Sequence, residues 1–105
     1  VAHQAIDLAR PKENYNKSAG YTQQEIDSFT KLLETGFVDT FRHLYPDTIK
    51  YSYWNFVTFG RDKNVGWRID HFLVNQKKLS NVKDALIYNE YHGSDHCPVG
   101  LKIEI

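Results

Sequence analysis

The sequence predicts an α/β fold in which helices lie outside an antiparallel-rich mixed sheet. Helical periodicity comes early in the chain, whereas strand-like segments joined by short loops fill most of the second half. Short connections of this kind favour antiparallel neighbours. A hydrophobic content of 41% and an aromatic content of 14% exclude a disordered polar tail. With 105 residues and no internal repeat, the chain is at most one small domain with a marginal core.

In the first part of the chain, residues 1–8 are predicted to end a strand and enter a loop. Residues 10–20 are polar and contain proline, asparagine and glycine, which is typical of a surface loop. Thr22 and Glu25 have the spacing of a capping box, so a helix should begin there, and Gly36 should end it. The apolar residues of this helix repeat at helical spacing: Ile26, Phe29, Leu32 and Leu33.

Beyond that helix, residues 39–45 are predicted to form a short helical turn that Pro46 ends. Residues 61–66 are a polar loop. The remaining apolar segments have the aromatic, β-branched or alternating composition of strands. The segments predicted to be strands are residues 51–59, 68–74, 82–88 and 99–105.

The charges balance, with 13 Lys and Arg against 13 Asp and Glu. A net charge of zero is not typical of a nucleic-acid binder, although a nuclease needs only local positive charge near its phosphates. Two sparse basic clusters could supply that charge, and a solvated loop is the alternative for each. The clusters are Arg10, Lys12 and Lys17, and Arg61, Lys63 and Arg68.

Cys97 is the only cysteine, which excludes an intrachain disulfide and a cysteine-based zinc site. A thiol nucleophile would need its own base. We therefore expect Cys97 to be a small buried residue at the start of the last strand. No apolar run approaches about 18 residues, so we expect no membrane-spanning segment.

Two segments at the edges of predicted strands, Gly66 to Asp70 and Gly93 to Pro98, contain residues able to do chemistry. His96 can exchange protons near neutral pH. Asp70 and Asp95 are carboxylates that could orient the imidazole or hold a hard cation. The residue types alone leave simpler interpretations open: a surface Asp70 beside a loop histidine, and an Asp95 that caps its own turn.

The order of several motifs resembles the exonuclease III-type apurinic/apyrimidinic (AP) endonucleases of the endonuclease/exonuclease/phosphatase superfamily. Residues 66–72, Gly-Trp-Arg-Ile-Asp-His-Phe, and residues 93–98, Gly-Ser-Asp-His-Cys-Pro, match two family motifs. Residues 1–8 resemble the segment that follows the family's Gly-Asp-Leu/Phe-Asn motif. Shorter matches at 41–46 and 63–66 extend the resemblance over essentially the whole chain.

The resemblance implies a four-layer α/β sandwich of two sheets, the DNase I-like fold. Residues 1–105 would be the C-terminal part of one such domain. The family's metal-binding Glu, its catalytic Tyr and the Asp and Asn of the Gly-Asp-Leu/Phe-Asn motif would then lie upstream of Val1. We therefore expect the chain to be part of a larger enzyme and to be inactive in isolation.

By resemblance, His96 is the general base or phosphate ligand, Asp70 orients it, and Asp95 lies near the metal. Asp95 and His96 are the metal-site residues expected in this chain. The pocket for a flipped-out sugar that lacks its base would comprise Tyr53, Trp67 and Ile69, for which a plain core position is the alternative. The expected DNA contacts are Arg10, Lys12, Asn14 and Asn64.

The implied activity is hydrolysis of the DNA phosphodiester 5′ to an abasic site in base excision repair, with Mg²⁺ or alternatively Mn²⁺. A 3′-exonuclease or 3′-phosphodiesterase activity accompanies it in the family. The implied partner is double-stranded DNA with abasic sites, and no membrane. The complete enzyme is expected to be an intracellular monomer, nuclear in a eukaryote and cytoplasmic in a bacterium. Two alternatives stay open: another phosphodiesterase or phosphatase of the superfamily, and a non-catalytic DNA-binding fragment.

Overall fold

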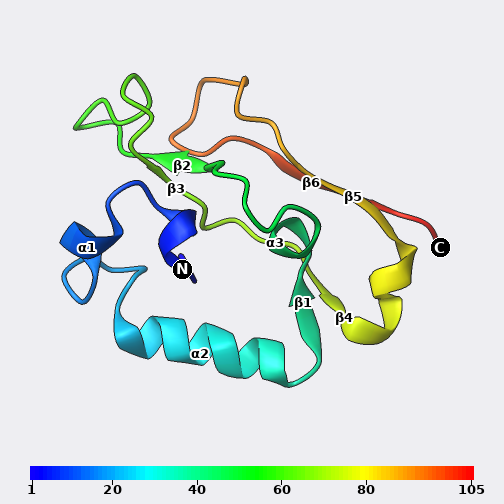
Figure 1. Ribbon diagram of the computed structural model, residues 1–105. Coiled ribbons are helices and arrows are strands. Elements are labelled where there is room, and N and C mark those ends of the chain that lie inside the picture. The colour runs from blue at the N-terminus through cyan, green and yellow to red at the C-terminus, as the bar shows by residue number, and fades with distance from the viewer.

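A computed structural model describes all 105 residues of the chain (Figure 1). The helices are η1 (Ala5–Asp7), α1 (Pro11–Asn14), α2 (Gln23–Glu34), α3 (Thr40–Leu44) and η2 (Gln76–Asn81), where η marks a 3₁₀ helix. The strands are β1 (Phe37–Asp39), β2 (Tyr53–Trp54), β3 (Gly66–Trp67), β4 (Leu73–Asn75), β5 (Val82–Ile87) and β6 (Val99–Ile103). No helix has both the length and the apolar character needed to cross a membrane.

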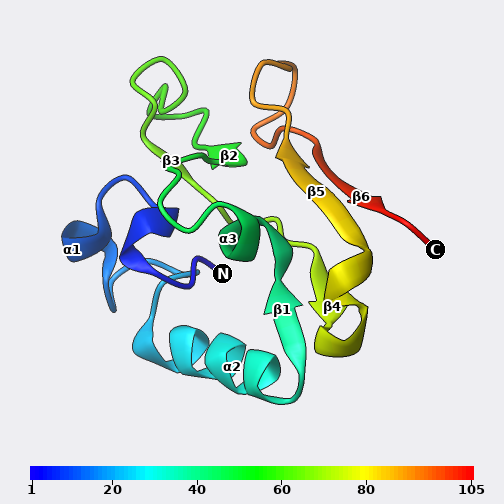
Figure 2. The same cartoon turned by 45° about the vertical axis from the view of Figure 1, so that its right-hand side comes forward.

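The strands pair in three antiparallel ribbons, β1 with β4, β2 with β3, and β5 with β6. In the longest ribbon Ala85 lies opposite Leu101, and Ile87 lies opposite Val99. Helix α2 runs along one side of the molecule, and α3 lies between α2 and the β5–β6 ribbon (Figure 2). The predicted α/β class and the antiparallel pairing are thus present, but the strands form separate ribbons where one mixed sheet was expected.

Helix α2 forms as the sequence predicts. The Thr22 hydroxyl accepts from the Glu25 N–H at 3.2 Å, and the Glu25 carboxylate accepts from the N–H groups of Gly20 and Thr22. The hydrogen bond from the Thr22 hydroxyl, with that from Gly20, lowers the pKa of the Glu25 carboxyl. Gly36 follows the helix with a φ of +113°, a backbone conformation that residues other than glycine rarely adopt.

The first twenty residues differ from the predicted elements. Residues 1–8 contain the single turn η1, and Leu8 makes only an isolated bridge to Trp67 where the end of a strand was expected. Residues 10–20 are not wholly a loop, because α1 begins at Pro11. Proline favours the first helical position, since its fixed φ suits a helix and its missing N–H would have no partner there.

Two strands differ from the prediction in length or in presence. The segment 51–59 forms only β2, because the chain turns from Phe56 onward and Phe59 takes a left-handed φ of 52°. Strand β1 was not predicted, because three residues are too short to show an alternating pattern. It pairs with β4, where Val38 lies opposite Val74.

The predicted strand 68–74 enters a ribbon only at Leu73. The reason is that its first N–H groups have other acceptors. The Arg68 N–H donates to the Asp7 carbonyl at 2.6 Å, and the next two N–H groups donate to the Ser52 hydroxyl at 3.2 Å each. These donors are therefore unavailable for a strand ladder.

Two apolar clusters form the core. The larger cluster lies between α3, β2 and the β5–β6 ribbon, and comprises Phe41, Tyr51, Trp54, Ala85, Ile87 and Cys97. The smaller cluster lies between the N-terminal segment and β3, and comprises Ala2, Leu8 and Tyr21, with Ile26, Trp67 and Ile69 packed against it. The expected burial of Cys97 is confirmed, and burial raises the pKa of its thiol.

Buried charges join four segments of the chain. The fully buried Arg68 donates from Nε to Asp7 Oδ1 at 2.8 Å, and from Nη1 to Asp39 Oδ1 at 3.0 Å. Its Nη2 donates to the second oxygen of Asp39. Arg42 Nη2 donates to Asp7 Oδ1 at 2.7 Å. The network thus ties η1, β1 and α3 to the segment that follows β3.

The network keeps these groups charged. Burial alone would raise the pKa of the Asp7 carboxyl, but Arg68 and Arg42 outweigh this effect and hold that pKa below its ordinary value. Burial also opposes the charged form of Arg68, whereas Asp39 and Asp7 reverse the effect and raise the pKa of Arg68. Removing one partner would leave a buried charge without its counter-ion.

We therefore predict that Asp7→Asn destabilises the chain by about 3–5 kcal/mol, because it leaves the buried Arg68 incompletely paired. Small domains have a total free energy of unfolding of roughly 5–15 kcal/mol, so this loss is a large share of it and the variant should unfold at a much lower urea concentration. Urea titration followed by circular dichroism measures the change. The control is Glu104→Gln, which breaks the exposed pair between Lys83 and Glu104 and should shift the midpoint little. Equal midpoints for the two variants would contradict the prediction.

His71 lies beside the network as a neutral imidazole. Arg68 Nη1 is 3.0 Å from His71 Nδ1 and can only donate, so Nδ1 accepts and Nε2 carries the proton. Nε2 then donates to the Val1 carbonyl at 2.7 Å. The ring also packs against Phe29, with ring centroids 5.0 Å apart. Burial lowers the pKa of His71, and the charge of Arg68 adds to this effect.

This lowered pKa predicts that acid weakens the fold through His71. The unfolded chain takes up the proton near pH 6.5, before the folded chain does. The contribution is therefore fully present above that pH and is lost as the pH falls toward the folded pKa. Thermal melting at pH 7.5 and pH 5.5 measures it. The variant His71→Gln should lose part of the acid sensitivity, and the exposed His43→Gln should retain all of it. Equal sensitivity in His71→Gln and in the unchanged chain would contradict the assignment.

Candidate functional site

The loop that carries His96 is held against the edge of β2. The Trp54 N–H donates to the Asp95 carbonyl at 2.9 Å, and the Cys97 N–H donates to the Ser52 carbonyl at 2.9 Å. These bonds flank an isolated antiparallel bridge between Tyr53 and His96. The residue between Asp95 and Cys97 is therefore fixed to the strand by its neighbours' main chain.

Asp70 and His96, which are 26 residues apart, are brought together. His96 Nδ1 lies 2.7 Å from Asp70 Oδ2. An ionised carboxylate can only accept, so Nδ1 donates, and Nε2 of the neutral imidazole is left as an acceptor. The side chains are 43% and 35% exposed, and the His96 ring is tilted against Tyr53 with ring centroids 5.1 Å apart. The pair is open to solvent and can take up a proton from a bound molecule.

The position of Asp70 depends on Ser52 and Arg68. The buried Ser52 hydroxyl accepts from the N–H groups of Ile69 and Asp70 at 3.2 Å each. Arg68, two residues before Asp70, is fixed by the buried ion network. Ser52 is not predicted from the sequence, because a lone serine between two tyrosines carries no signal of a supporting role.

The side chain of Asp95 makes only one long hydrogen bond. Its Oδ1 accepts from the Ser94 hydroxyl at 3.4 Å, and the same hydroxyl accepts from the His96 N–H at 3.2 Å. Ser94 therefore caps this turn, a role that the sequence left open for Asp95. The Asp95 carboxylate lacks a cationic partner, so it remains available to a cation.

A metal held here would need further ligands. The chain contains no group of three or more His, Cys, Asp or Glu side chains arranged to bind an ion. Mg²⁺ binds through one or two carboxylates and completes its shell with water and substrate phosphate oxygens. Asp95 fits one such position, and His96 has only Nε2 free because Nδ1 is bonded to Asp70.

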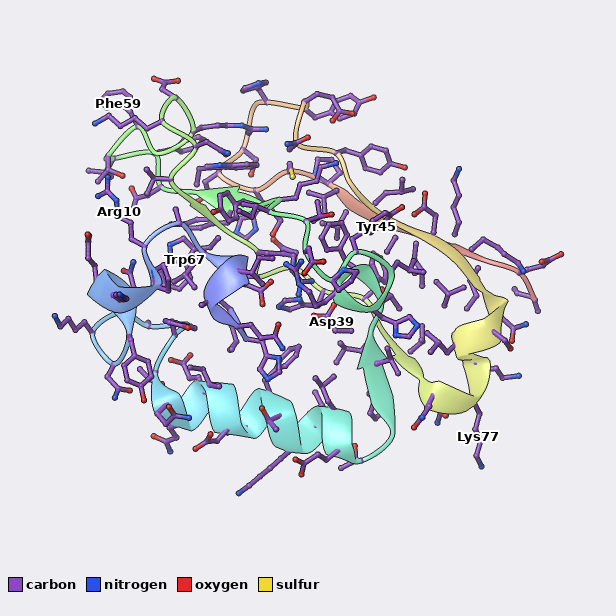
Figure 3. All side chains as sticks on the ribbon, viewed as in Figure 1. Arg10, Asp39, Tyr45, Phe59, Trp67 and Lys77 are labelled. Atoms are coloured by element: carbon purple, nitrogen blue, oxygen red, sulfur yellow. The ribbon has the colours of Figure 1, made fainter.

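A cavity of about 610 Å³ lies next to this site. It is lined by all three residues expected to form the sugar pocket, Tyr53, Trp67 and Ile69, and by Arg10 and Asn14. Figure 3 shows Arg10 and Trp67 toward the same end of the molecule. Neither Asp70 nor His96 lines this cavity, but Tyr53 lines it and also packs against the His96 ring, so the cavity and the Asp70–His96 pair are neighbours that share Tyr53.

The four residues expected to contact DNA have different environments. Arg10 lines the cavity, and Lys12 is exposed on α1 outside its lining. The amide of Asn14 is used within its own loop, since it donates to the Arg10 carbonyl at 2.7 Å and accepts from Ser18 at 2.6 Å. Asn64 Oδ1 accepts from Trp54 Nε1 at 3.0 Å.

Arg68 does not take part in the second of the two basic clusters considered from the sequence. Arg68 is buried with Asp7 and Asp39, so it can neither meet a phosphate nor lie in a solvated loop. The guanidinium of Arg61 donates to backbone carbonyls of the loop before His96. A charge count along the sequence could not reveal these internal acceptors.

Comparison with known proteins gives a consistent set of relatives, although no family model matches the chain. It is 52% identical to an exodeoxyribonuclease of Bacillus subtilis (strain 168), over all of this chain and 42% of that protein. It is 48% identical to the DNA repair nuclease APEX1 of Danio rerio, over all of this chain and 34% of that protein. The chain thus spans less than half the length of these relatives.

Solved structures agree with this result. The chain superposes over its full length on the AP endonuclease LMAP of Leishmania major, with a TM-score of 0.91 and 32% identity, covering 33% of that chain. It superposes on the 3′ phosphatase NExo of Neisseria bound to a product DNA hairpin, with a TM-score of 0.92 and 26% identity, covering 42% of that chain.

Proposed function

Because this chain belongs, as a partial segment, to the exonuclease III-type AP endonuclease family, we propose that the protein containing it hydrolyses the DNA phosphodiester 5′ to an abasic site. The observation that carries this proposal is the Asp70–His96 pair, 2.7 Å apart, beside a cavity lined by Tyr53, Trp67 and Ile69. The reaction class is the metal-assisted attack of water on a phosphodiester in double-stranded DNA.

In this proposal His96 acts through Nε2, either as the acceptor of the proton of the attacking water or, once protonated, as a donor to the scissile phosphate. Asp70 fixes the tautomer and stabilises the imidazolium that forms. Ser52 and Arg68 act through Asp70, because they hold the main chain at and just before that residue and so fix the position of its carboxylate.

Asp95 would contribute to holding Mg²⁺, or Mn²⁺ in its place, and His96 would border the same ion. A bound divalent cation supplies neutralisation of the charge on the phosphate. We propose that the other ligands come from the part of the domain that this chain does not span, since the matched relatives are more than twice as long. That part would also complete a four-layer α/β sandwich, of which residues 1–105 form the C-terminal part.

The cavity supports selectivity for a sugar without a base. Trp67 and Ile69 present apolar surface that suits a bare deoxyribose, and an abasic nucleotide loses no base stacking when it leaves the duplex. Arg10 at the cavity and Lys12 on α1 would position the DNA backbone. Asn64 is bonded only through Oδ1 and Asn14 uses one of its two side-chain N–H donors, so both keep an N–H that could donate to a phosphate.

A 3′-phosphatase or 3′-exonuclease activity of the same site is the second candidate. It is favoured by the close superposition on the Neisseria protein described as a 3′ phosphatase. Both reactions use an activated water and a phosphate-bound cation, so the catalytic residues would be unchanged. They differ in whether the phosphate lies within the strand or at its 3′ end.

The test is cleavage of a duplex with one abasic analogue by the complete protein in Mg²⁺. We predict that His96→Ala and Asp70→Ala each lower kcat by roughly 10²–10⁴-fold, the range of general acid–base catalysis. The double variant should be only slightly slower than the slower of the two single variants, because the two residues act on one step. DNA binding should change far less.

The controls separate the candidates. EDTA should abolish cleavage, and Mg²⁺ should restore it. A duplex with a 3′-phosphate at a nick measures the second candidate in parallel. Near-unchanged turnover in His96→Ala, or full activity in EDTA, would reject the proposed mechanism. Release of phosphate from the nick without cleavage at the abasic analogue would select the phosphatase.

A further inference from the structure

Arg61 joins two irregular loops, residues 55–65 between β2 and β3 and residues 88–98 between β5 and β6. Its guanidinium carbon lies 4.3 Å from the ring centroid of Trp54. Nη2 donates to the Asn89 carbonyl at 2.8 Å and also to the carbonyl of Tyr91. Nη1 donates to the Ser94 carbonyl at 3.3 Å. One side chain of the first loop thus holds three main-chain oxygens of the second.

The second loop has few other anchors before the residues that carry the chemistry. It is bonded to β2 only at Asp95 and Cys97, through their backbone groups. Residues 89–94 make one further backbone bond, from the Tyr91 N–H to the Tyr88 carbonyl at 3.2 Å. The Tyr88 N–H also donates to the Pro98 carbonyl at 2.9 Å, and the His96 N–H donates to the Ser94 hydroxyl. Between these bonds, the carbonyl groups of Asn89, Tyr91 and Ser94 are held by the guanidinium of Arg61.

Hydrogen bonds within the first loop hold the segment from which Arg61 extends. Asn55 Oδ1 accepts from the Val57 N–H at 2.8 Å, and the Asn55 carbonyl accepts from the Gly60 N–H at 3.0 Å. The Val65 N–H donates to the Gly60 carbonyl at 2.7 Å. A Cβ on Gly60 would lie 2.8 Å from the Val65 carbonyl oxygen, so this loop also requires a glycine directly before Arg61.

We propose that Arg61 is a positioning residue for His96. It holds the second loop in the position that places His96 Nδ1 within hydrogen-bond distance of Asp70. Arg61 does this by donating to carbonyl oxygens of the loop, and it does not bind a phosphate of the DNA. The proposal rests on the proposed function, because it concerns the same reaction. A lysine cannot replace the planar fork, since its single ammonium cannot reach three carbonyls and stack on Trp54 at once.

The first test uses Arg61→Gln and Arg61→Lys in the complete protein, with Lys78→Gln on η2 as a control for the lost charge. We expect kcat to fall roughly 10–100-fold in Arg61→Gln, the scale of a small misplacement of a catalytic group, while KM stays within about threefold. Arg61→Lys should be intermediate, and Lys78→Gln should match the unchanged protein. A raised KM with kcat kept and a weaker salt dependence would show a phosphate contact and overturn the proposal.

The second test is hydrogen exchange in the complete protein, which does not depend on activity. The Trp54 and Cys97 amides, which bind the second loop and the β2 edge to each other, should exchange at least about tenfold faster in Arg61→Gln, as expected for local opening. The Ile26 amide in α2 is the internal reference, and a change there would indicate general unfolding. If Arg61→Gln unfolds in this way, the exchange rates of the Trp54 and Cys97 amides are compared between Arg61→Lys and the protein without substitutions.

The two tests distinguish the two proposals. Unchanged exchange at Trp54 and Cys97 in both Arg61 variants would overturn the role of Arg61, whatever the activity. If exchange is faster in the Arg61 variants but the protein without substitutions cleaves no DNA, the proposed function is rejected and Arg61 remains the anchor of this loop.

Discussion

A fully buried guanidinium, that of Arg68, is the feature on which the arrangement of the other segments depends. A charge in this position is tolerated only when carboxylates surround it. Asp7 and Asp39 meet that need from η1 and β1, and Arg42 joins from α3 by sharing an oxygen of Asp7. The ribbons are short and do not form one sheet, so these directed contacts supply connections that strand pairing does not.

The buried network and the exposed site are adjacent along the same backbone. Arg68 is fixed inside, and Asp70 two residues later reaches the surface. Between them, the Ser52 hydroxyl accepts both of the N–H groups that a strand ladder would otherwise use. Where the predicted strand is interrupted, the Asp70 carboxylate lies 2.7 Å from His96 while its backbone is held by Ser52.

The sequence predicted local features better than long-range ones. The capping box at Thr22 and the stop at Gly36 depend on neighbouring residues, and both are confirmed. The motifs around Asp70 and His96 led to the expectation of a pair that the structure brings to 2.7 Å. Neither of the environments considered for Arg68, a phosphate contact or a solvated loop, is present, because its burial depends on acceptors 29 and 61 residues away. Ser52 had no signal at all, since its contact is with a distant main chain.

The most direct measurement is the position of the proton on the His96 ring, observed by long-range ¹H–¹⁵N NMR in the 105-residue chain at neutral pH. If Asp70 orients the imidazole as described, the proton lies on Nδ1 and Nε2 is bare. Asp70→Ala should remove this preference, whereas Asp95→Asn should leave it unchanged. A ring with a proton on Nε2 and a bare Nδ1, or a spectrum that does not respond to Asp70→Ala, would contradict the pairing on which the proposed chemistry depends.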